Sequence, residues 1–307
     1  MSGSGHGKKA IVAAFSANLG IAIAKFIGFL FTRSSSMLAE SVHSFADTGN
    51  QGLLLLGARR SSRAADSDHP FGYGSERYFW AFVVALVLFL GGATFAIYEG
   101  ISKIRHPHEL ESAGWAIAIL LFAVVLEGFS FRTAIVEANQ SRGSRSIWRF
   151  IREARAPELP VVILEDLGAL AGLVLALLGV VLALVTGNAV FDGIGTLSIG
   201  LLLAVIAIVL AVEMKSLLLG ESALPEEEAL ITQALVDGRQ VRSVIHFKTM
   251  HIGPDELLLA TKLEFDAGLN LADLAGAIDA AEQRVRAAVP TTKLIYIEPD
   301  LRRSLDG

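Results

Sequence analysis

Long apolar segments, separated by short polar ones, fill the first two thirds of the chain. About 20 apolar residues in helical form cross a hydrocarbon core of about 30 Å, and six windows are long enough. They cover approximately residues 10–32, 37–58, 78–100, 113–136, 160–186 and 190–214. The pattern therefore predicts a membrane domain of six transmembrane helices.

The pattern changes after Glu221. Pro225 followed by three glutamates favours the start of a helix, because proline fits the first turn and acids are stabilised at the helix N-terminus. A strand, a strand, an amphipathic helix and a strand are then predicted at 241–250, 257–265, 271–289 and 293–297. This order predicts a small α+β domain of ferredoxin-like type. We expect a transmembrane domain at 1–220 and a cytosolic domain at 221–307.

Basic residues predict the orientation of the helices, because they are enriched in cytosolic loops. Only Arg33, Lys103 and Arg105 fall on one side of the predicted spans, and both termini are therefore expected to be cytosolic, in the plasma or inner membrane. The long basic segment 137–159 is predicted to lie at the membrane interface, with Trp148 and Phe150 in the headgroup layer. The basic residues of the opposite, cytosolic side are Lys8, Lys9, Arg59, Arg60, Arg63, Arg77, Arg142, Arg145, Arg149, Arg152, Arg155 and Lys215.

Composition agrees with a membrane protein and narrows its chemistry. The chain has 307 residues, of which 53% are apolar, and its mean hydropathy is +0.54. A net charge of -5 argues against nucleic acid as a partner, because a phosphate backbone calls for a clustered basic surface. Since there is no cysteine, any bound metal must be held by His, Asp, Glu, backbone groups or water.

Ionisable residues inside the second window indicate a metal site. Glu40, His43 and Asp47 occur there, although a charged group near the bilayer centre costs at least about 2.5 kcal/mol. His43 and Asp47 are four residues apart, so an imidazole and a carboxylate on one helical face can share an ion. The alternative is a His–Asp hydrogen bond that only ties helices together.

The fifth window contributes two adjacent acids, Glu165 and Asp166, with no basic residue nearby in the sequence. The alternative is an interfacial position open to water. One imidazole with two or three carboxylates suits zinc and also accepts ferrous iron, cobalt, manganese or cadmium. These ligands lose protons when they bind metal, so metal loading and proton release are linked, which is the physical basis for antiport.

Two motifs resemble the cation diffusion facilitator family. The segment 36–51 resembles its second span, and 68–77 resembles its loop before the third span; 47–51 and 164–166 further resemble the branch with the mitochondrial zinc transporters. The resemblance covers essentially the whole chain. It implies a homodimer, not an enzyme, that exports zinc or a similar divalent ion by alternating access in exchange for protons, without an organic cofactor. The metal would lie between spans two and five, at His43, Asp47, Glu165 and Asp166.

The sequence departs from the family in span five and in the loop. Most relatives have a second HxxxD motif in span five. In this sequence Glu165 falls at the histidine position of that motif and Ala169 at the aspartate position. Asp166, Asn50 or water could complete the shell. In the loop, where relatives often bind a second metal, Asp68 and His69 are present and Tyr73 replaces a histidine. The loop either binds metal or uses Asp68 to cap a turn beside His69.

The tail departs as well. The positions at which zinc-sensing relatives use ligands are His246, Lys262, Ala275, Tyr296 and Glu298. A lysine in this set would repel a cation, so we expect a dimerisation domain rather than a metal sensor, with His246 and His251 as ordinary strand residues.

Other intramembrane polar residues are expected to pair between helices or to reach an interface: Lys25, Glu99, Glu127, Arg132 and Asp192. For Glu127 a proton-relay role remains an alternative. Gly49, Gly52 and Gly57 are expected to let spans two and five approach closely.

Two alternative functions stay open at this point. One is a membrane metal sensor or scaffold that does not transport. The other is an intramembrane hydrolase using His43, Asp47 and Glu165 around a metal, although HExxH, GxSxG and nucleotide-binding P-loop motifs are all absent from the sequence.

Overall fold

The computed structural model describes residues 35–107 and 113–301, together with parts of the segment 15–30; in the helix that starts at residue 35, side chains are described from Phe45 onward. The predicted first span is therefore described only in part, and Lys25 and the side chain of His43 lie outside the described residues. The chain divides into two compact units. One contains the described residues up to Arg60 and Glu76–Lys215, and the other contains Ser61–Ser75 and the chain from Ser216 onward.

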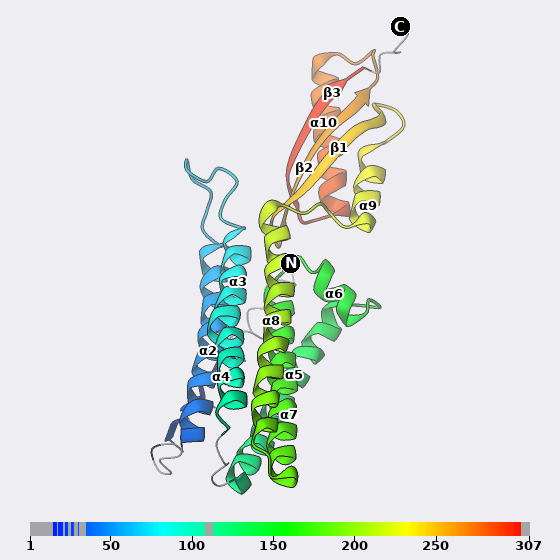
Figure 1. Ribbon diagram of the computed structural model, residues 1–307. Coiled ribbons are helices and arrows are strands. Elements are labelled where there is room, and N and C mark those ends of the chain that lie inside the picture. Colours follow the sequence, from blue (N-terminus) through cyan, green and yellow to red (C-terminus); the bar gives the residue numbers. More distant parts are fainter. Residues whose placement is uncertain are drawn as a thin grey trace. The chain divides into compact units, whose positions relative to one another are not determined.

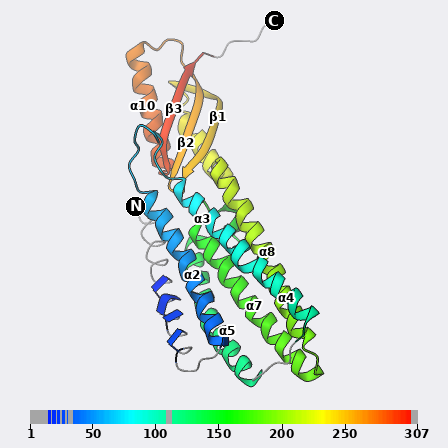
Figure 2. The same ribbon diagram turned by 60° about the vertical axis from the view of Figure 1, so that its left-hand side comes forward.

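The first unit is helical. α2 packs against α3, and α5 packs against α7 (Figures 1 and 2). A π-helical turn, η1, joins α3 and α4 into one continuous helical segment. The elements are α2 (Ser35–Arg60), α3 (Glu76–Val87), η1 (Leu88–Ala93), α4 (Thr94–Arg105), α5 (Ala113–Ser141), α6 (Ile147–Glu153), α7 (Glu158–Thr186) and α8 (Val190–Leu219).

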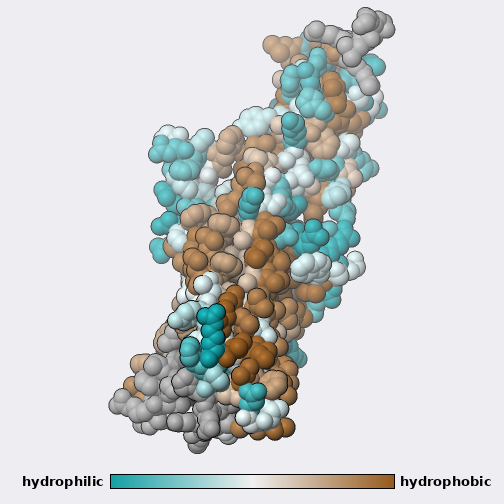
Figure 3. Space-filling view, in the orientation of Figure 1, coloured by the Kyte–Doolittle hydropathy of each residue, from teal (hydrophilic) through white to brown (hydrophobic). Residues whose placement is uncertain are grey.

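Four helical segments among the described residues are long and apolar enough to cross a membrane: Glu76–Arg105, Ile117–Ser141, Glu158–Thr186 and Val190–Leu219. They coincide with the last four predicted windows and make this an integral membrane protein. Hydrophobic residues, in brown, dominate these helices in the space-filling view (Figure 3). α2 is one 26-residue helix over the second predicted window, but its polar residues keep it outside this apolar group.

Glycines set the closest helix approaches in this unit. A Cβ added at Gly100 of α4 would lie 2.5 Å from the backbone nitrogen of Leu197 in α8, and one at Gly200 would lie 2.6 Å from that of Ile97. Small residues therefore bring these backbones together, as in other membrane helix pairs.

The glycines of α2 have other neighbours than predicted. Gly57 faces α3, where an added Cβ would lie 2.9 Å from Cβ of Trp80, and Gly52 faces Phe15. Nothing lies within 4 Å of an added Cβ at Gly49. The prediction that these glycines let spans two and five approach is therefore wrong.

The basic connector after α5 contains the short helix α6. Ser146 caps it by accepting a hydrogen bond from the backbone N–H of Arg149 at 3.2 Å. Trp148 is 51% exposed and is available to an interface, whereas Phe150 is only 6% exposed. The prediction for Phe150 is wrong, because its ring packs inside the protein, with the Arg145 guanidinium 5.8 Å from the ring centre.

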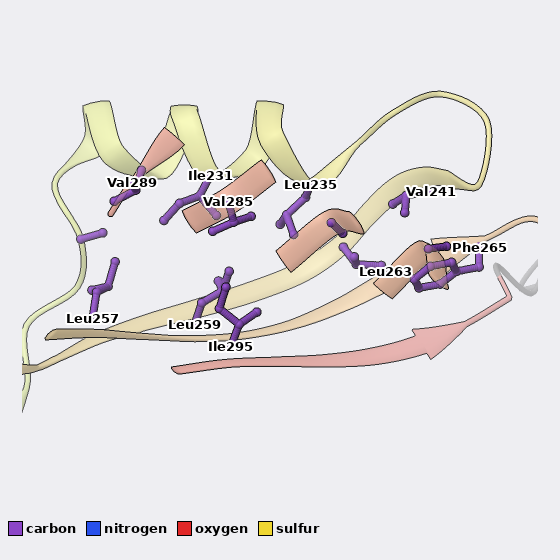
Figure 4. Close-up of a cluster of buried hydrophobic side chains, with 13 residues drawn as sticks. Ile231, Leu235, Val241, Leu257, Leu259, Leu263, Phe265, Val285, Val289 and Ile295 are labelled. Atoms are coloured by element: carbon purple, nitrogen blue, oxygen red, sulfur yellow. The ribbon is translucent and has the colours of Figure 1, made fainter. Parts of the chain in front are cut away.

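The second unit has the predicted order of elements. They are α9 (Pro225–Leu235), β1 (Val241–Gly253), β2 (Glu256–Phe265), α10 (Leu271–Ala288) and β3 (Thr292–Asp300). The sheet order is β1-β2-β3, with β1 antiparallel and β3 parallel to the central β2. Both helices cover one face of the sheet, and Ile231, Leu259 and Val285 belong to the apolar core between them (Figure 4). All three strands are longer than predicted: β1 continues to Gly253, β2 begins at Glu256, and β3 runs from Thr292 to Asp300.

The loop between α2 and α3 belongs to this second unit. An added Cβ at Gly74 would lie 2.5 Å from the carbonyl oxygen of Ile252 and 2.8 Å from Cα of Gly253. The Ser75 hydroxyl also donates a hydrogen bond to the Ile252 carbonyl at 3.1 Å. The loop thus lies directly on the end of β1.

Candidate metal centre

Polar side chains follow one side of α2. Asp47 is half-buried, while Asn50 and Gln51 are 4% and 1% exposed. Residues three and four apart share a helical face, so the helix places the backbone of His43, then Asp47, then Asn50 and Gln51 along one stripe. The predicted His43 and Asp47 pair thus continues into two amides.

The two acids of α7 are buried and turn toward different helices. Glu165 and Asp166 are 7% and 4% exposed, so neither lies open to solvent. The Asn50 side-chain amide of α2 donates a hydrogen bond to Oε1 of Glu165 at 2.7 Å. The Ser130 hydroxyl of α5 donates to Oδ2 of Asp166 at 2.8 Å. Since consecutive helical residues differ by about 100° in direction, one helix serves two neighbours.

Negative charge collects around these acids. The charges that act most strongly on Glu165 are Asp47, Asp166 and Glu127, and Asp166 is likewise repelled by Glu127 and Asp47. Four carboxylates from α2, α5 and α7 therefore lie close enough for their charges to act on Glu165 or Asp166. Such a cluster among apolar helices is costly unless protons or a cation offset the charge.

The described side chains do not by themselves form a closed metal site. No group of three described His, Asp or Glu side chains is close enough to hold an ion. Two buried acceptor atoms are nevertheless available to a ligand: Oε2 of Glu165 and Oε1 of Gln51 accept no hydrogen bond from any described residue. Oxygen donors of this kind suit a divalent metal ion or a proton.

Two ion pairs join helices of this unit, and the partners in each were not predicted from the sequence. Arg77 of α3 makes a two-pronged ion pair with Glu158 in the first turn of α7, with Nη2 to Oε2 at 2.8 Å. Lys103 of α4 contacts Asp192 of α8 at 2.9 Å. The second contact confirms the expectation that Asp192 pairs between helices. Arg132, another of the polar residues expected to pair or to reach an interface, is exposed on α5.

The α2–α3 loop is organised by Asp66. Its Oδ1 accepts the backbone N–H groups of His69 at 2.8 Å and Asp68 at 3.1 Å, and its Oδ2 accepts the Tyr73 hydroxyl at 2.6 Å. The Tyr73 hydrogen bond is the main reason that the pKa of Asp66 is lowered, and it raises the pKa of Tyr73. The turn is therefore capped by Asp66, whose carboxylate accepts these three hydrogen bonds, and not by Asp68, which was one of the two alternatives from the sequence.

In the tail, a lysine occupies the centre of the sheet row made by His246, Lys262 and Glu298. Its ammonium lies 2.9 Å from Oδ2 of Asp300 and 3.0 Å from Oε1 of Glu298. Both carboxylates, Asp300 first, raise the pKa of Lys262. A fixed side-chain cation thus satisfies these acids.

Comparison with known proteins gives a family and several relatives. The Cation efflux transmembrane domain family matches residues 11–219. The chain is 34% identical over 244 residues to the mitochondrial proton-coupled zinc antiporter SLC30A9 of Mus musculus, which covers 79% of this chain and 43% of the relative. It is 30% identical over 264 residues to metal tolerance protein C4 of Arabidopsis thaliana, 85% of this chain and 58% of the relative.

A bacterial relative matches over nearly its full length. The magnetosome protein MamB of Magnetospirillum gryphiswaldense is 25% identical over 285 residues, 92% of this chain and 90% of that protein. By contrast, the chain spans less than half the length of the SLC30A9 proteins it matches.

Proposed function

Because this chain belongs to the cation efflux family, the cation diffusion facilitators, in the branch with the mitochondrial zinc antiporter, we propose that it exports a divalent metal ion from the cytosol in exchange for protons. Zinc is the proposed substrate, with iron, manganese or cobalt as further candidates. The protein would cross the plasma or inner membrane six times, with both termini in the cytosol. Its ferredoxin-like tail would join two copies into a homodimer.

The observation that carries this proposal is the buried acid pair of α7 opposite the polar stripe of α2. His43 and Asp47 would bind the ion from α2, and Glu165 and Asp166 from α7. Buried carboxylates in an apolar helix are expensive unless they handle ions or protons. The relatives described above, a proton-coupled zinc antiporter and a metal tolerance protein, support the proposal of metal transport.

The exchange follows from the chemistry of the ligands. Imidazole and carboxylate groups must lose protons before they bind metal, so metal arriving from the cytosol displaces protons. When the site opens to the other side, protons returning to the same groups release the ion. Alternating exposure of one site thus couples the two movements without nucleotide or any organic cofactor.

Flux in proteoliposomes tests this function. His43→Ala and Asp47→Ala should each abolish zinc flux, because each removes a proposed ligand, and Glu165→Gln or Asp166→Asn should weaken metal binding at least about tenfold. His106→Ala, at an exposed position after α4, is the matched control and should retain flux. All variants should insert and elute like wild type.

Wild-type flux in both His43→Ala and Asp47→Ala would contradict the assignment. Metal binding without flux in the unaltered protein would instead favour a sensor or scaffold. The lysine that pairs with Asp300 and Glu298 in the tail argues against sensing by that domain.

A further inference from the structure

One oxygen of Glu165 is already occupied. The Asn50 amide holds Oε1 at 2.7 Å, and the two side chains are 4% and 7% exposed, so water does not compete for this bond. The other oxygen, Oε2, is buried and has no hydrogen-bond partner among the described residues. Glu165 therefore offers a single free oxygen.

Asn50 lies on the same side of α2 as the proposed ligand Asp47. The two residues are three apart in α2 and share a face. Asp47 also lies near enough to repel the Glu165 carboxylate. The hydrogen bond consequently fixes the orientation of Glu165 beside the polar stripe of α2, as second-layer hydrogen bonds orient metal-binding carboxylates elsewhere.

We propose that Asn50 is a positioning residue that determines metal specificity, because it limits Glu165 to binding an ion through Oε2 alone. This inference rests on the proposed function. A carboxylate that binds through one oxygen suits the four-coordinate, tetrahedral zinc ion. Manganese prefers six oxygen ligands, and larger ions readily take both oxygens of a carboxylate. The hydrogen bond that occupies Oε1 thus favours zinc over manganese.

Asp166 shows the same arrangement independently. Ser130 donates a hydrogen bond to one of its oxygens at 2.8 Å, so each of the two acids in α7 has one oxygen taken by a neutral donor from a neighbouring helix. A neutral donor restrains the carboxylate without adding charge. The arrangement keeps the count of available oxygens low while leaving the negative charge that attracts the ion.

The test compares zinc and manganese in the purified full chain. Asn50→Ala removes the donor, and Asn50→Asp replaces it with a group of equal size that cannot donate when ionised. Equilibrium binding and initial flux in proteoliposomes are measured for both metals. We expect zinc affinity to fall about 10-fold to 100-fold and manganese affinity to fall less than about threefold. The zinc-to-manganese ratio should therefore drop at least about threefold in both variants.

Two controls isolate the role of the hydrogen bond. Asn139→Ala, exposed on α5, should leave the ratio unchanged. In a Glu165→Ala background, Asn50→Ala should cause no further change in the ratio, because its partner is already gone. An additional drop in that background would show that Asn50 acts by another route and would overturn the proposal.

The outcomes separate this inference from the proposed function. If the unaltered protein neither binds nor moves either metal, the proposed function fails. If it moves zinc but both Asn50 variants keep the wild-type ratio, or lose manganese more than zinc, only the role of Asn50 is refuted. Asn50→Asp keeps the volume of the side chain, so a misfolded Asn50→Ala still leaves a decisive variant.

Discussion

Single buried residues in this protein take partners from distant parts of the chain. Glu165 and Asp166 are adjacent, yet one is held by α2 and the other by α5. Arg77 and Glu158 are 81 positions apart and join α3 to α7. Such contacts concern charged or strongly polar groups with little access to water, so the loss of one partner leaves the other uncompensated.

The Arg77 and Glu158 pair gives a stability prediction at this scale. Arg77→Ala or Glu158→Gln should destabilise the protein by about 3–5 kcal/mol, because each leaves a buried group without its partner. The side chains are only 15% and 6% exposed. Thermal unfolding in detergent would report the change as a lower midpoint.

The more exposed pair Arg149 and Glu153 of α6 is the matched control. Arg149→Ala should cost about 0.3–0.5 kcal/mol, since Arg149 is 55% exposed and water replaces its partner. The double variant Arg77→Met with Glu158→Leu should be more stable than either single change, because it removes both charges together. Equal midpoints for Arg77→Ala and Arg149→Ala would refute a structural role of the buried pair.

At the scale of elements, glycine decides which helices touch. Gly100 and Gly200 bring α4 and α8 to backbone contact, and Gly74 lets the α2–α3 loop lie on the end of β1. In each case the nearest atom belongs to the backbone, which cannot rotate away as a side chain can. These contacts are therefore intolerant of even one added methyl group.

Gly100→Ala tests this packing. Its new Cβ would lie 2.5 Å from the nitrogen and 2.7 Å from Cα of Leu197, so α4 and α8 must separate. We expect a loss of about 1–3 kcal/mol and a lower unfolding midpoint in detergent.

The control for this change is Gly128→Ala in α5, where an added Cβ meets nothing within 4 Å. Alanine favours a helix over glycine by about 1 kcal/mol, so this variant should be as stable as wild type or more stable. If the Gly100→Ala variant were as stable as the Gly128→Ala variant, the inferred close contact between α4 and α8 would be refuted.

For the whole molecule, the proposed exchange couples metal movement to protons through one acidic interior. Asp47, Glu127, Glu165 and Asp166 come from three helices, and their mutual repulsion is relieved by either protons or a divalent ion. The four carboxylates therefore cannot all be protonated while they also bind a divalent ion.

Proton movement is the corresponding prediction. Zinc entering proteoliposomes should be accompanied by proton release on the opposite side, read with a pH-sensitive dye, and collapse of the pH gradient should slow uptake. Zinc affinity should rise with pH by up to about tenfold per unit for each proton displaced, because the ligands must be deprotonated. Vesicles with His43→Ala should show neither signal. Zinc flux that is unaffected by pH and moves no protons would rule out antiport.

Much of the architecture is readable from the sequence for a physical reason. A bilayer demands about 20 apolar residues per span, so four predicted windows coincide with the described helices that are long and apolar enough to cross a membrane. In the tail, alternating and amphipathic patterns predict the order from α9 to β3, because one face of each element must be apolar to build the shared core. Six spans, and the ligand set at His43, Asp47, Glu165 and Asp166, stay predictions.

Only the tertiary structure decides which faces meet. Periodicity identifies the polar side of α2 and the acids of α7. The hydrogen bond from Asn50 to Glu165, residues 115 positions apart in the sequence, depends on how the two helices pack. The same limit explains the errors at Phe150 and Gly57, whose neighbours are supplied by Arg145 and Trp80. A sequence specifies the apolar and polar sides of each element through local geometry. The partner of each side follows from packing the whole chain, which no local pattern encodes.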